Sequence, residues 1–192
     1  MIGLLTLLTQ ILTITLRAGT SLIYAALGEI YTERSGILNL GLEGMMLTGA
    51  VTAFATAFYT GSTWLGVLVA MLMGMAMATI HAFLTVTMRA NQVVSGLSIT
   101  LFGTGLASFL GERLGPASNG GNLVGMVGPR FKPIEIPMLS QVPLVGALFK
   151  QDVLTYLLYI LVPLATYYLF KTRNGLNLRA VGESPQTADA MG

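Results

Sequence analysis

The sequence predicts an all-α protein that crosses a membrane several times. Of its 192 residues, 54% are hydrophobic and only 9% are charged, whereas soluble domains average about 25% charged residues. The mean hydropathy is +0.74, and apolar runs recur that can each cross a hydrocarbon core of about 30 Å. We therefore expect a single transmembrane domain over residues 1–192, a polytopic helix bundle of about five spans. The spans are expected at about residues 4–30, 37–59, 63–88, 93–111 and 153–170.

The first expected span carries one polar stripe. Its members recur at spacings of four, three, four and three, which places them on one face of a helix: Thr6, Gln10, Thr13, Arg17 and Thr20. The segment up to Ile30 would reach about 43 Å as a helix, which is longer than the hydrocarbon core requires. Arg17 falls near its middle, and two readings stay open. Either the stripe faces the bundle interior, or the span starts later and Arg17 snorkels to the headgroups.

The stretch 28–49, GEIYTERSGILNLGLEGMMLTG, combines glycines with polar residues between two apolar runs. Each glycine costs about 1 kcal/mol relative to alanine inside a helix, and polar groups such as Asn39 and Glu43 are costly in lipid. We expect a short turn from Tyr31 to Ser35, followed by a partly broken, Gly-rich helix near 36–49. Its freed backbone would line a route through the membrane. The alternative is a close helix–helix contact in which Glu43 pairs with a neighbour.

The third and fourth spans are predicted to pack closely. Small residues recur every four positions, which lets helix backbones approach each other: Ala70, Gly74, Ala78 and Ala82 in one span, and Gly96, Thr100, Thr104 and Ser108 in the other. A short polar break containing Asn91 and Gln92 separates them. The hydroxyl row can also face a cavity, although packing alone accounts for such a row equally well. His81 is expected to be a bundle histidine with one hydrogen bond rather than a proton relay.

The segment 112–151 is predicted to be a long loop outside the membrane. It contains prolines at positions 116, 129, 133, 137 and 143, and proline removes backbone donors and stops helices. A short amphipathic piece is expected at 139–149. The last span follows at 153–170, with a kink at Pro163.

The tail 171–192 is polar and is predicted to be cytoplasmic. Lys171, Arg173 and Arg179 favour that side, and counting spans backwards places the N-terminus outside. Ser184 and Pro185 are typical of a helix start, as N-cap and first helical residue. A helix that ends with the chain after so few residues is not a stable terminus, so we expect the natural protein to continue beyond Gly192.

Four stretches resemble one family of membrane proteins: ERSGILNLGLEGMM (33–46), RANQVVSGLSITLFGTGL (89–106), PMLSQVPLVGALF (137–149) and TRNGLNLRAVGESPQTADAMG (172–192). In order and over nearly the whole chain, they resemble the permease subunit of bacterial ABC importers. The resemblance is to the branched-chain amino-acid and ribose permease superfamily, in its simple-sugar or nucleoside branch. It implies a longer protein, so that this chain would be truncated at its C-terminus.

The resemblance also implies partners and a docking segment. In that family the pattern GE-x-P-x-x-A-x-x-x-G marks the cytoplasmic coupling helix, which docks on the ATPase. The positions that it assigns to coupling are Glu183, Ser184, Pro185, Ala188, Ala190 and Gly192. The implied partners are one or more ABC ATPase subunits, a second permease subunit, identical or homologous, an extracytoplasmic solute-binding protein and membrane lipid. The implied location is the bacterial plasma membrane.

The function expected from these observations is passage of a small polar solute, most simply a nucleoside or a simple sugar. The residues expected along the pathway are Arg17, Asn39, Glu43, Asn91, Gln92, Thr100 and Thr104. We expect no catalytic residue, metal or cofactor in this chain, since it has no cysteine, a single histidine and no P-loop pattern. A net charge of +2 without a basic run also argues against nucleic-acid binding. The alternatives are an ion-coupled secondary transporter, for which only Glu43 is a suitable acid, and a membrane scaffold without transport.

Overall fold

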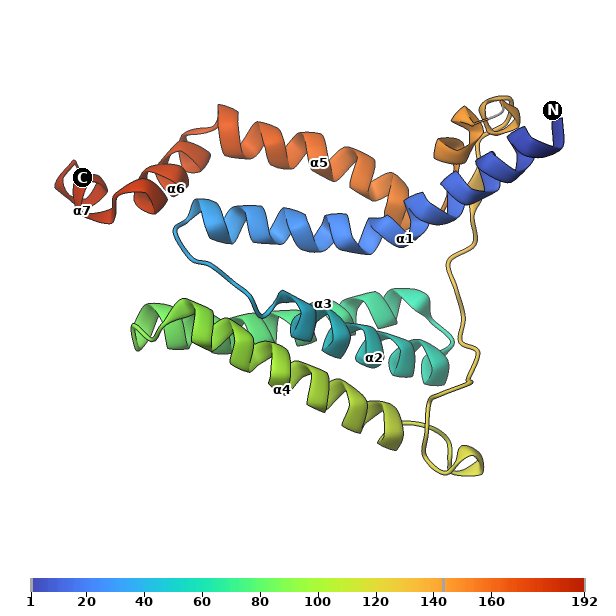
Figure 1. Ribbon diagram of the computed structural model, residues 1–192, viewed down its shortest axis with the longest axis horizontal. Coiled ribbons are helices and arrows are strands. Elements are labelled where there is room, and N and C mark those ends of the chain that lie inside the picture. Colours follow the sequence, from blue (N-terminus) through green and yellow to red (C-terminus); the bar gives the residue numbers. More distant parts are fainter. Residues whose placement is uncertain (1, 143, 192) are drawn as a thin grey trace. The chain divides into compact units, whose positions relative to one another are not determined.

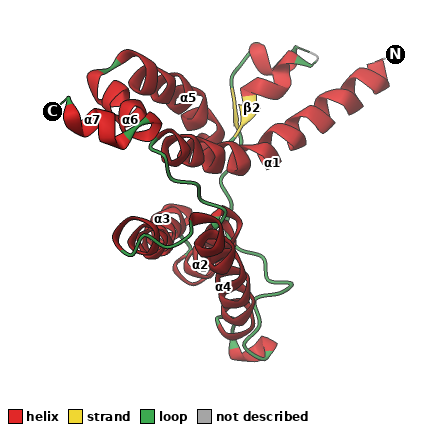
Figure 2. Cartoon of the chain, turned by 60° about the vertical axis from the view of Figure 1, so that its left-hand side comes forward, coloured by secondary structure: helices red, strands yellow, loops and turns green. Residues whose placement is uncertain are grey.

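The computed structural model describes residues 2–142 and 144–191, and nearly all of its regular structure is helical (Figures 1 and 2). The all-α class predicted from the sequence is therefore confirmed. The helices are α1 (Ile2–Arg34), α2 (Leu42–Thr60), α3 (Thr63–Ala82), α4 (Gln92–Arg113), α5 (Val153–Lys171), α6 (Arg173–Glu183) and α7 (Pro185–Ala190). A π-helical turn, η1 (Phe83–Thr87), continues α3.

The chain divides into two compact units. The first unit takes in the chain up to Gly36 and from Phe131 onward, and the second is Ile37–Arg130. The first is built on α1 and α5, and the second on α2, α3 and α4.

In the second unit, α2 packs against both α3 and α4. Glycines make the close approach possible, because an added Cβ at Gly66 would lie 2.7 Å from the carbonyl oxygen of Ala53. A Cβ at Gly103 would lie 2.6 Å from the backbone of Gly44. The helices therefore pack closely at Gly66 and Gly103, whereas the space beside Gly74, a member of the small-residue row expected in the third span, is open. Met45, Met77 and Ile99 form the small apolar core between the three helices.

In the first unit, α1 and α5 lie side by side (Figure 1). Three hydrogen bonds made by side chains of the described residues join the two helices. The Tyr24 hydroxyl donates to the carbonyl oxygen of Leu154 over 2.8 Å, and the Tyr31 hydroxyl donates to that of Ala165 over 2.9 Å. The hydroxyls of Thr20 and Thr155 are 3.0 Å apart. α5 continues through Pro163 as one helix.

Four helices of the described chain have the length and apolar composition of membrane spans: 3–34, 63–87, 92–113 and 153–171. The span expected at 37–59 is not among them. α2 has 19 residues, about 28 Å at 1.5 Å per residue, but four threonines lower its hydropathy. Its buried residues include Thr48, Gly49 and Ala57.

The turn after the first helix lies later than the sequence suggested, and the break occupies the start of the stretch 36–49. α1 continues through Arg34, so the turn expected at 31–35 is placed at Ser35 and Gly36 instead. Gly36 has a φ of +90°, in the left-handed region that favours glycine. Residues 37–39 have no regular secondary structure, a turn follows at 40–41, and α2 begins at Leu42. We call residues 35–41 the unwound segment.

The long loop is irregular, as expected, but it contains short elements. These are η2 (Ala117–Asn119), β1 (Ile134–Glu135), η3 (Leu139–Gln141), η4 (Val145–Phe149) and β2 (Lys150–Gln151). The amphipathic piece expected at 139–149 is thus two 3₁₀ turns. β1 and β2 pair antiparallel, and the Lys150 ammonium lies 2.7 Å from a carboxylate oxygen of Glu135.

Candidate functional site

The unwound segment lies against polar side chains of α3 and α4. A non-helical backbone leaves N–H and C=O groups that need other partners. The N–H of Leu38 donates to Oε1 of Gln92 over 2.8 Å, and the carbonyl oxygen of Leu38 lies 3.3 Å from Nε2 of His81. The hydroxyl of Thr100 donates to the carbonyl oxygen of Leu40 over 2.7 Å. Three side chains from two helices thereby provide hydrogen-bond partners for the N–H and carbonyl groups of Leu38 and the carbonyl group of Leu40.

The side chain of Asn39 forms hydrogen bonds with residues that follow it in the chain. Its side chain is 9% exposed, and its Oδ1 accepts a hydrogen bond from the N–H of Gly41 over 3.0 Å. Its Nδ2 donates to the sulfur of Met45 over 3.7 Å. Asparagine side chains that bond their own backbone two residues onward stabilise turns, so Asn39 shapes the entry into α2.

His81 is buried between the unwound segment and α4. It is 4% exposed, and Ser95 is 5% exposed. Nδ1 of His81 lies 3.0 Å from the Ser95 hydroxyl. Because a carbonyl oxygen only accepts hydrogen bonds, Nε2 must carry the proton that reaches Leu38. In the neutral imidazole, Nδ1 then accepts from Ser95. The sequence predicted one hydrogen bond for this histidine, whereas its ring makes two.

Glycines bring the unwound segment and the start of α2 against α4. A Cβ at Gly96 would lie 2.7 Å from the N of Leu40, and one at Gly41 would lie 2.7 Å from Cγ2 of Ile99. A Cβ at Gly44 would lie 2.6 Å from the carbonyl oxygen of Ile99. No side chain fits at these places, so the polar contacts of the segment depend on backbone contact between the elements.

Of the predicted pathway residues, the structure groups Asn39, Gln92 and Thr100 around the unwound segment. Glu43 is exposed in the first turn of α2, where the positive end of the helix dipole favours a carboxylate. It makes no hydrogen bond or ion pair with the residues that the structure describes. The Thr104 side chain is exposed and donates back to the carbonyl oxygen of Thr100 over 2.8 Å.

Two predicted pathway residues have clear local roles. Asn91 is the N-cap of α4, since its Oδ1 accepts from the N–H groups of Val93 and Val94 over 3.0 and 3.2 Å. Arg17 belongs to the other unit, where its Nε lies 4.0 Å from Oδ2 of Asp152. Asp152 is also the N-cap of α5, and the Arg17 side chain itself is 46% exposed.

The expected coupling residues begin with a well-formed helix start. Ser184 caps α7, accepting from the N–H of Thr187 over 3.4 Å, and Pro185 is the first helical residue. Ala188 is half-buried, and Glu183 and Ala190 are exposed. Gly192 lies outside the described residues. The sequence did not indicate α6, which precedes this start and is capped by Thr172.

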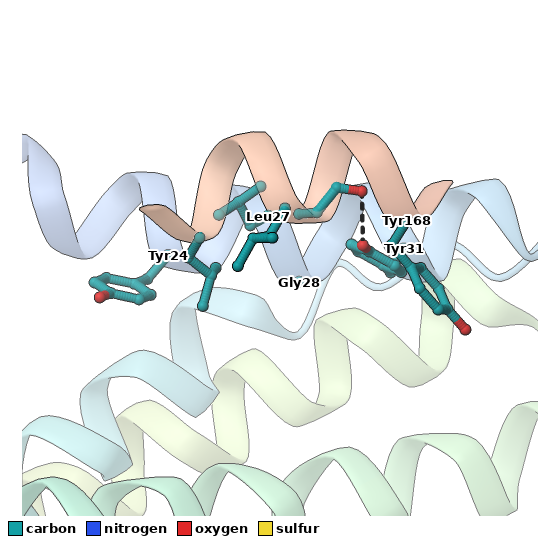
Figure 3. A pocket seen from close by; sticks show the side chains of 8 residues that line it. Tyr24, Leu27, Gly28, Tyr31 and Tyr168 are labelled. Atoms are coloured by element: carbon teal, nitrogen blue, oxygen red, sulfur yellow. Dashed lines mark hydrogen bonds between the residues drawn. The ribbon is translucent and has the colours of Figure 1, made fainter. Parts of the chain in front are cut away.

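An apolar groove runs between α1 and α5 (Figure 3). It has a volume of about 470 Å³ and is lined by Tyr24, Leu27, Gly28, Tyr31, Leu161, Leu164, Ala165 and Tyr168. Figure 3 shows the bond from the Tyr31 hydroxyl to α5 at one end of the groove. None of the predicted pathway residues lines it. Among the described residues, no three His, Asp or Glu side chains lie close enough together to hold a metal ion.

Helices of membrane-spanning length, together with a discontinuous stretch held by polar side chains of the neighbouring helices, define a multi-pass helical membrane protein. Residues 11–192 match the model of the branched-chain amino acid transport system permease component, and the chain belongs to this family. The resemblance drawn from the sequence motifs is thereby confirmed. No solved structure matches the chain.

Curated relatives carry permease names. A putative glucose ABC transporter permease protein of Haloferax volcanii is 43% identical over 183 residues, covering 95% of this chain and 54% of the relative. A nucleoside ABC transporter permease protein of Lactococcus lactis is 37% identical over 181 residues, covering 90% and 56%. A guanosine ABC transporter permease protein of Bacillus subtilis is 36% identical over 197 residues, covering 96% and 60%. The chain thus spans between half and two thirds of the length of these relatives.

Sequence reasoning missed the partners of Leu38. It placed Asn39 in a broken helix and named Gln92, but it treated His81 only as a bundle histidine and named no partner for it. The available signal was the break itself, because an unwound stretch in a membrane bundle requires side-chain donors and acceptors nearby. The apolar surroundings of His81 in the sequence did not indicate which backbone group it would reach.

Proposed function

We propose that this chain is part of the transmembrane subunit of an ABC importer that moves a nucleoside or a simple sugar. The carrying observation is the unwound segment, whose backbone is held by Gln92, His81 and Thr100. Discontinuous helices of this kind form solute sites in membrane transporters. The names of the sugar and nucleoside relatives support the choice of solute.

The proposed pathway contains Arg17, Asn39, Glu43, Asn91, Gln92, Thr100 and Thr104. Within this set, Glu43 has the most to offer a solute. It is exposed, it has no partner among the described residues, and it follows the unwound segment directly. A carboxylate accepts hydrogen bonds from vicinal hydroxyls, which simple sugars and nucleosides share.

In this proposal the work of ATP hydrolysis belongs to a partner. The coupling segment, Glu183 to Ala190 with Gly192 beyond the described residues, docks on the ABC ATPase from the cytoplasmic side. A second permease subunit completes the pathway, and an extracytoplasmic binding protein delivers the solute. Residues 171–192 are then cytoplasmic and the N-terminus lies outside, in a bacterial plasma membrane. The chain itself performs no catalytic step.

The test is uptake of labelled nucleoside and labelled glucose by the full-length protein, assembled with its ATPase. Glu43→Gln keeps the size of the side chain and removes its charge. We expect uptake to fall by about tenfold or more, because a hydrogen bond to a charged group is worth about 1.5–3 kcal/mol. The matched control is Glu112→Gln, which alters an exposed carboxylate in the last turn of α4.

Two results would contradict the proposal. Unchanged uptake by Glu43→Gln at normal expression removes Glu43 from the pathway. Uptake that follows the proton gradient and ignores ATP depletion shows an ion-coupled carrier instead.

A further inference from the structure

We infer that His81, Ser95 and Gln92 form a backbone clamp on Leu38. These three side chains act as positioning residues that keep the unwound segment in its non-helical conformation. The clamp takes both main-chain polar groups of one residue. Gln92 Oε1 accepts from the N–H of Leu38 at 2.8 Å, and Nε2 of His81 donates to its carbonyl oxygen at 3.3 Å. The consequence for transport depends on the proposed function, whereas the clamp itself does not.

The clamp supplies what a helix would otherwise supply. In a continuous helix the N–H and C=O of Leu38 would bond to residues four positions away. Here residues 37–39 lie outside any helix, so those partners are lost and the side chains of the clamp take their place. With the clamp present, the non-helical form keeps the hydrogen bonds of Leu38. Without it, the segment either rewinds or samples other conformations.

Ser95 sets the direction of the histidine. Its hydroxyl, 3.0 Å from Nδ1 of His81, fixes the ring and leaves Nε2 to donate to Leu38. The Thr85 hydroxyl also donates to the carbonyl oxygen of His81 over 2.8 Å. Thr85 lies in the π-helical turn that ends this helical stretch, so this hydrogen bond links the π-helical turn to the backbone of His81.

The clamp connects Leu38 to the turn between α3 and α4. His81 lies near the end of α3, and Gln92 is the first residue of α4. Arg89, in the turn between them, has a φ of +53°, which is uncommon for a residue with a side chain. A displacement of this turn is therefore passed to the backbone of Leu38 from both sides. We assign the clamp the task of setting where Asn39 and Leu40 lie.

The experiment uses the full-length permease complex in membranes. Residues 1–192 contain no cysteine, so Leu38→Cys, with any cysteine elsewhere in the complex replaced, gives a single reporter. The backbone groups of position 38 remain available to the clamp. The readout is the rate at which N-ethylmaleimide modifies the introduced thiol, because the side chain of residue 38 is half-buried and becomes accessible when the segment moves.

Two pairs of variants separate clamping from mere packing. His81→Leu removes the donor, whereas His81→Gln keeps an N–H that can reach the Leu38 carbonyl. Gln92→Leu removes the acceptor, and Gln92→Glu keeps it. We expect about tenfold faster modification in the two leucine variants, the scale of one lost hydrogen bond. The Gln and Glu variants should label near the unsubstituted rate.

Ser95→Ala serves where His81→Leu does not accumulate. It leaves the core volume almost unchanged and frees only the imidazole, so modification should rise by an intermediate factor. Unchanged labelling in Ser95→Ala and Gln92→Leu overturns the clamp, as does equal labelling in His81→Leu and His81→Gln. If labelling follows the clamp but the complex takes up neither nucleoside nor sugar, the clamp stands and the proposed function fails.

Discussion

Thr100 and Thr104 look equivalent in the sequence, four residues apart on one row of α4. The structure separates them. The Thr100 hydroxyl reaches across to the carbonyl oxygen of Leu40, whereas the Thr104 hydroxyl returns to its own helix. A hydroxyl that bonds another element carries tertiary stability, and one that bonds its own helix carries little.

Replacing Thr100 with valine tests this difference. Thr100→Val keeps the shape and leaves the carbonyl of Leu40 without its partner, so we expect the complex to lose about 0.5–1.5 kcal/mol of stability. Thr79→Val is the control, because Thr79 is exposed on α3 and bonds only the carbonyl of Met75 in its own helix. Thermal unfolding of the purified complex in detergent measures both. Equal losses in the two variants would show that the contact with Leu40 contributes no stability.

The histidine shows where residue-level prediction ends. Composition indicated correctly that one buried histidine would be hydrogen-bonded. The identity of its partner depends on residues 43 positions apart, and that of Gln92 on residues 54 apart. No local pattern in the chain encodes such pairs, because both arise only when α3 and α4 have packed beside the unwound segment.

At the scale of elements, apolar length predicted α3, α4 and α5 well. The caps of the last two, Asn91 and Asp152, were not predicted, whereas Ser184 caps α7 as expected. The C-terminal end of α1 was misplaced because Tyr31 to Arg34 read as a polar turn. Instead, Tyr31 bonds α5 and its ring lies 6.0 Å from that of Tyr168. This tertiary contact keeps the last turn helical.

α6 was missed for a similar reason. Its sequence is polar and lacks an apolar face long enough to indicate a helix. Its stability comes from the Thr172 cap, from the close packing of Gly175 on the backbone of α5, and from Arg179, whose guanidinium lies 5.1 Å from the centre of the Phe170 ring. The contacts of Gly175 and Arg179 require α5 to be in place first, whereas the Thr172 cap is local.

Two glycines on α4 allow a matched test of helix packing. At Gly103 an added Cβ would lie 2.6 Å from the backbone of Gly44, whereas nothing lies within 4 Å of one at Gly105. We expect Gly103→Ala to cost about 1–3 kcal/mol through overpacking. Gly105→Ala should be neutral or stabilise by up to about 1 kcal/mol, because alanine is the better helix former. Thermal unfolding of both variants checks this, and similar values for the two would contradict the close approach of α2 and α4.

At the scale of the whole molecule, the proposed orientation makes a prediction about access. The polar tail should face the cytoplasm and the loop after α4 should face outward. Cysteines introduced at Gln186 and Ser118, both exposed, should therefore react differently in intact cells. A membrane-impermeant maleimide should label Ser118→Cys and spare Gln186→Cys until the cells are opened. The reverse pattern would invert the protein and remove the docking role of the tail.

The contact between Gly36 and Gly182 has a mechanical consequence. The Cα of Gly182 lies 3.2 Å from where a Cβ of Gly36 would be, and a Cβ on Gly182 would strike the carbonyl oxygen of Arg34. The end of α6 and the end of α1 therefore touch main chain to main chain, with no flexible side chain between them to absorb a load. A displacement of α6 towards α1 therefore acts directly on the backbone at Gly36. Gly36 is bonded to Ile37, so the displacement reaches the start of the next unit through the chain itself.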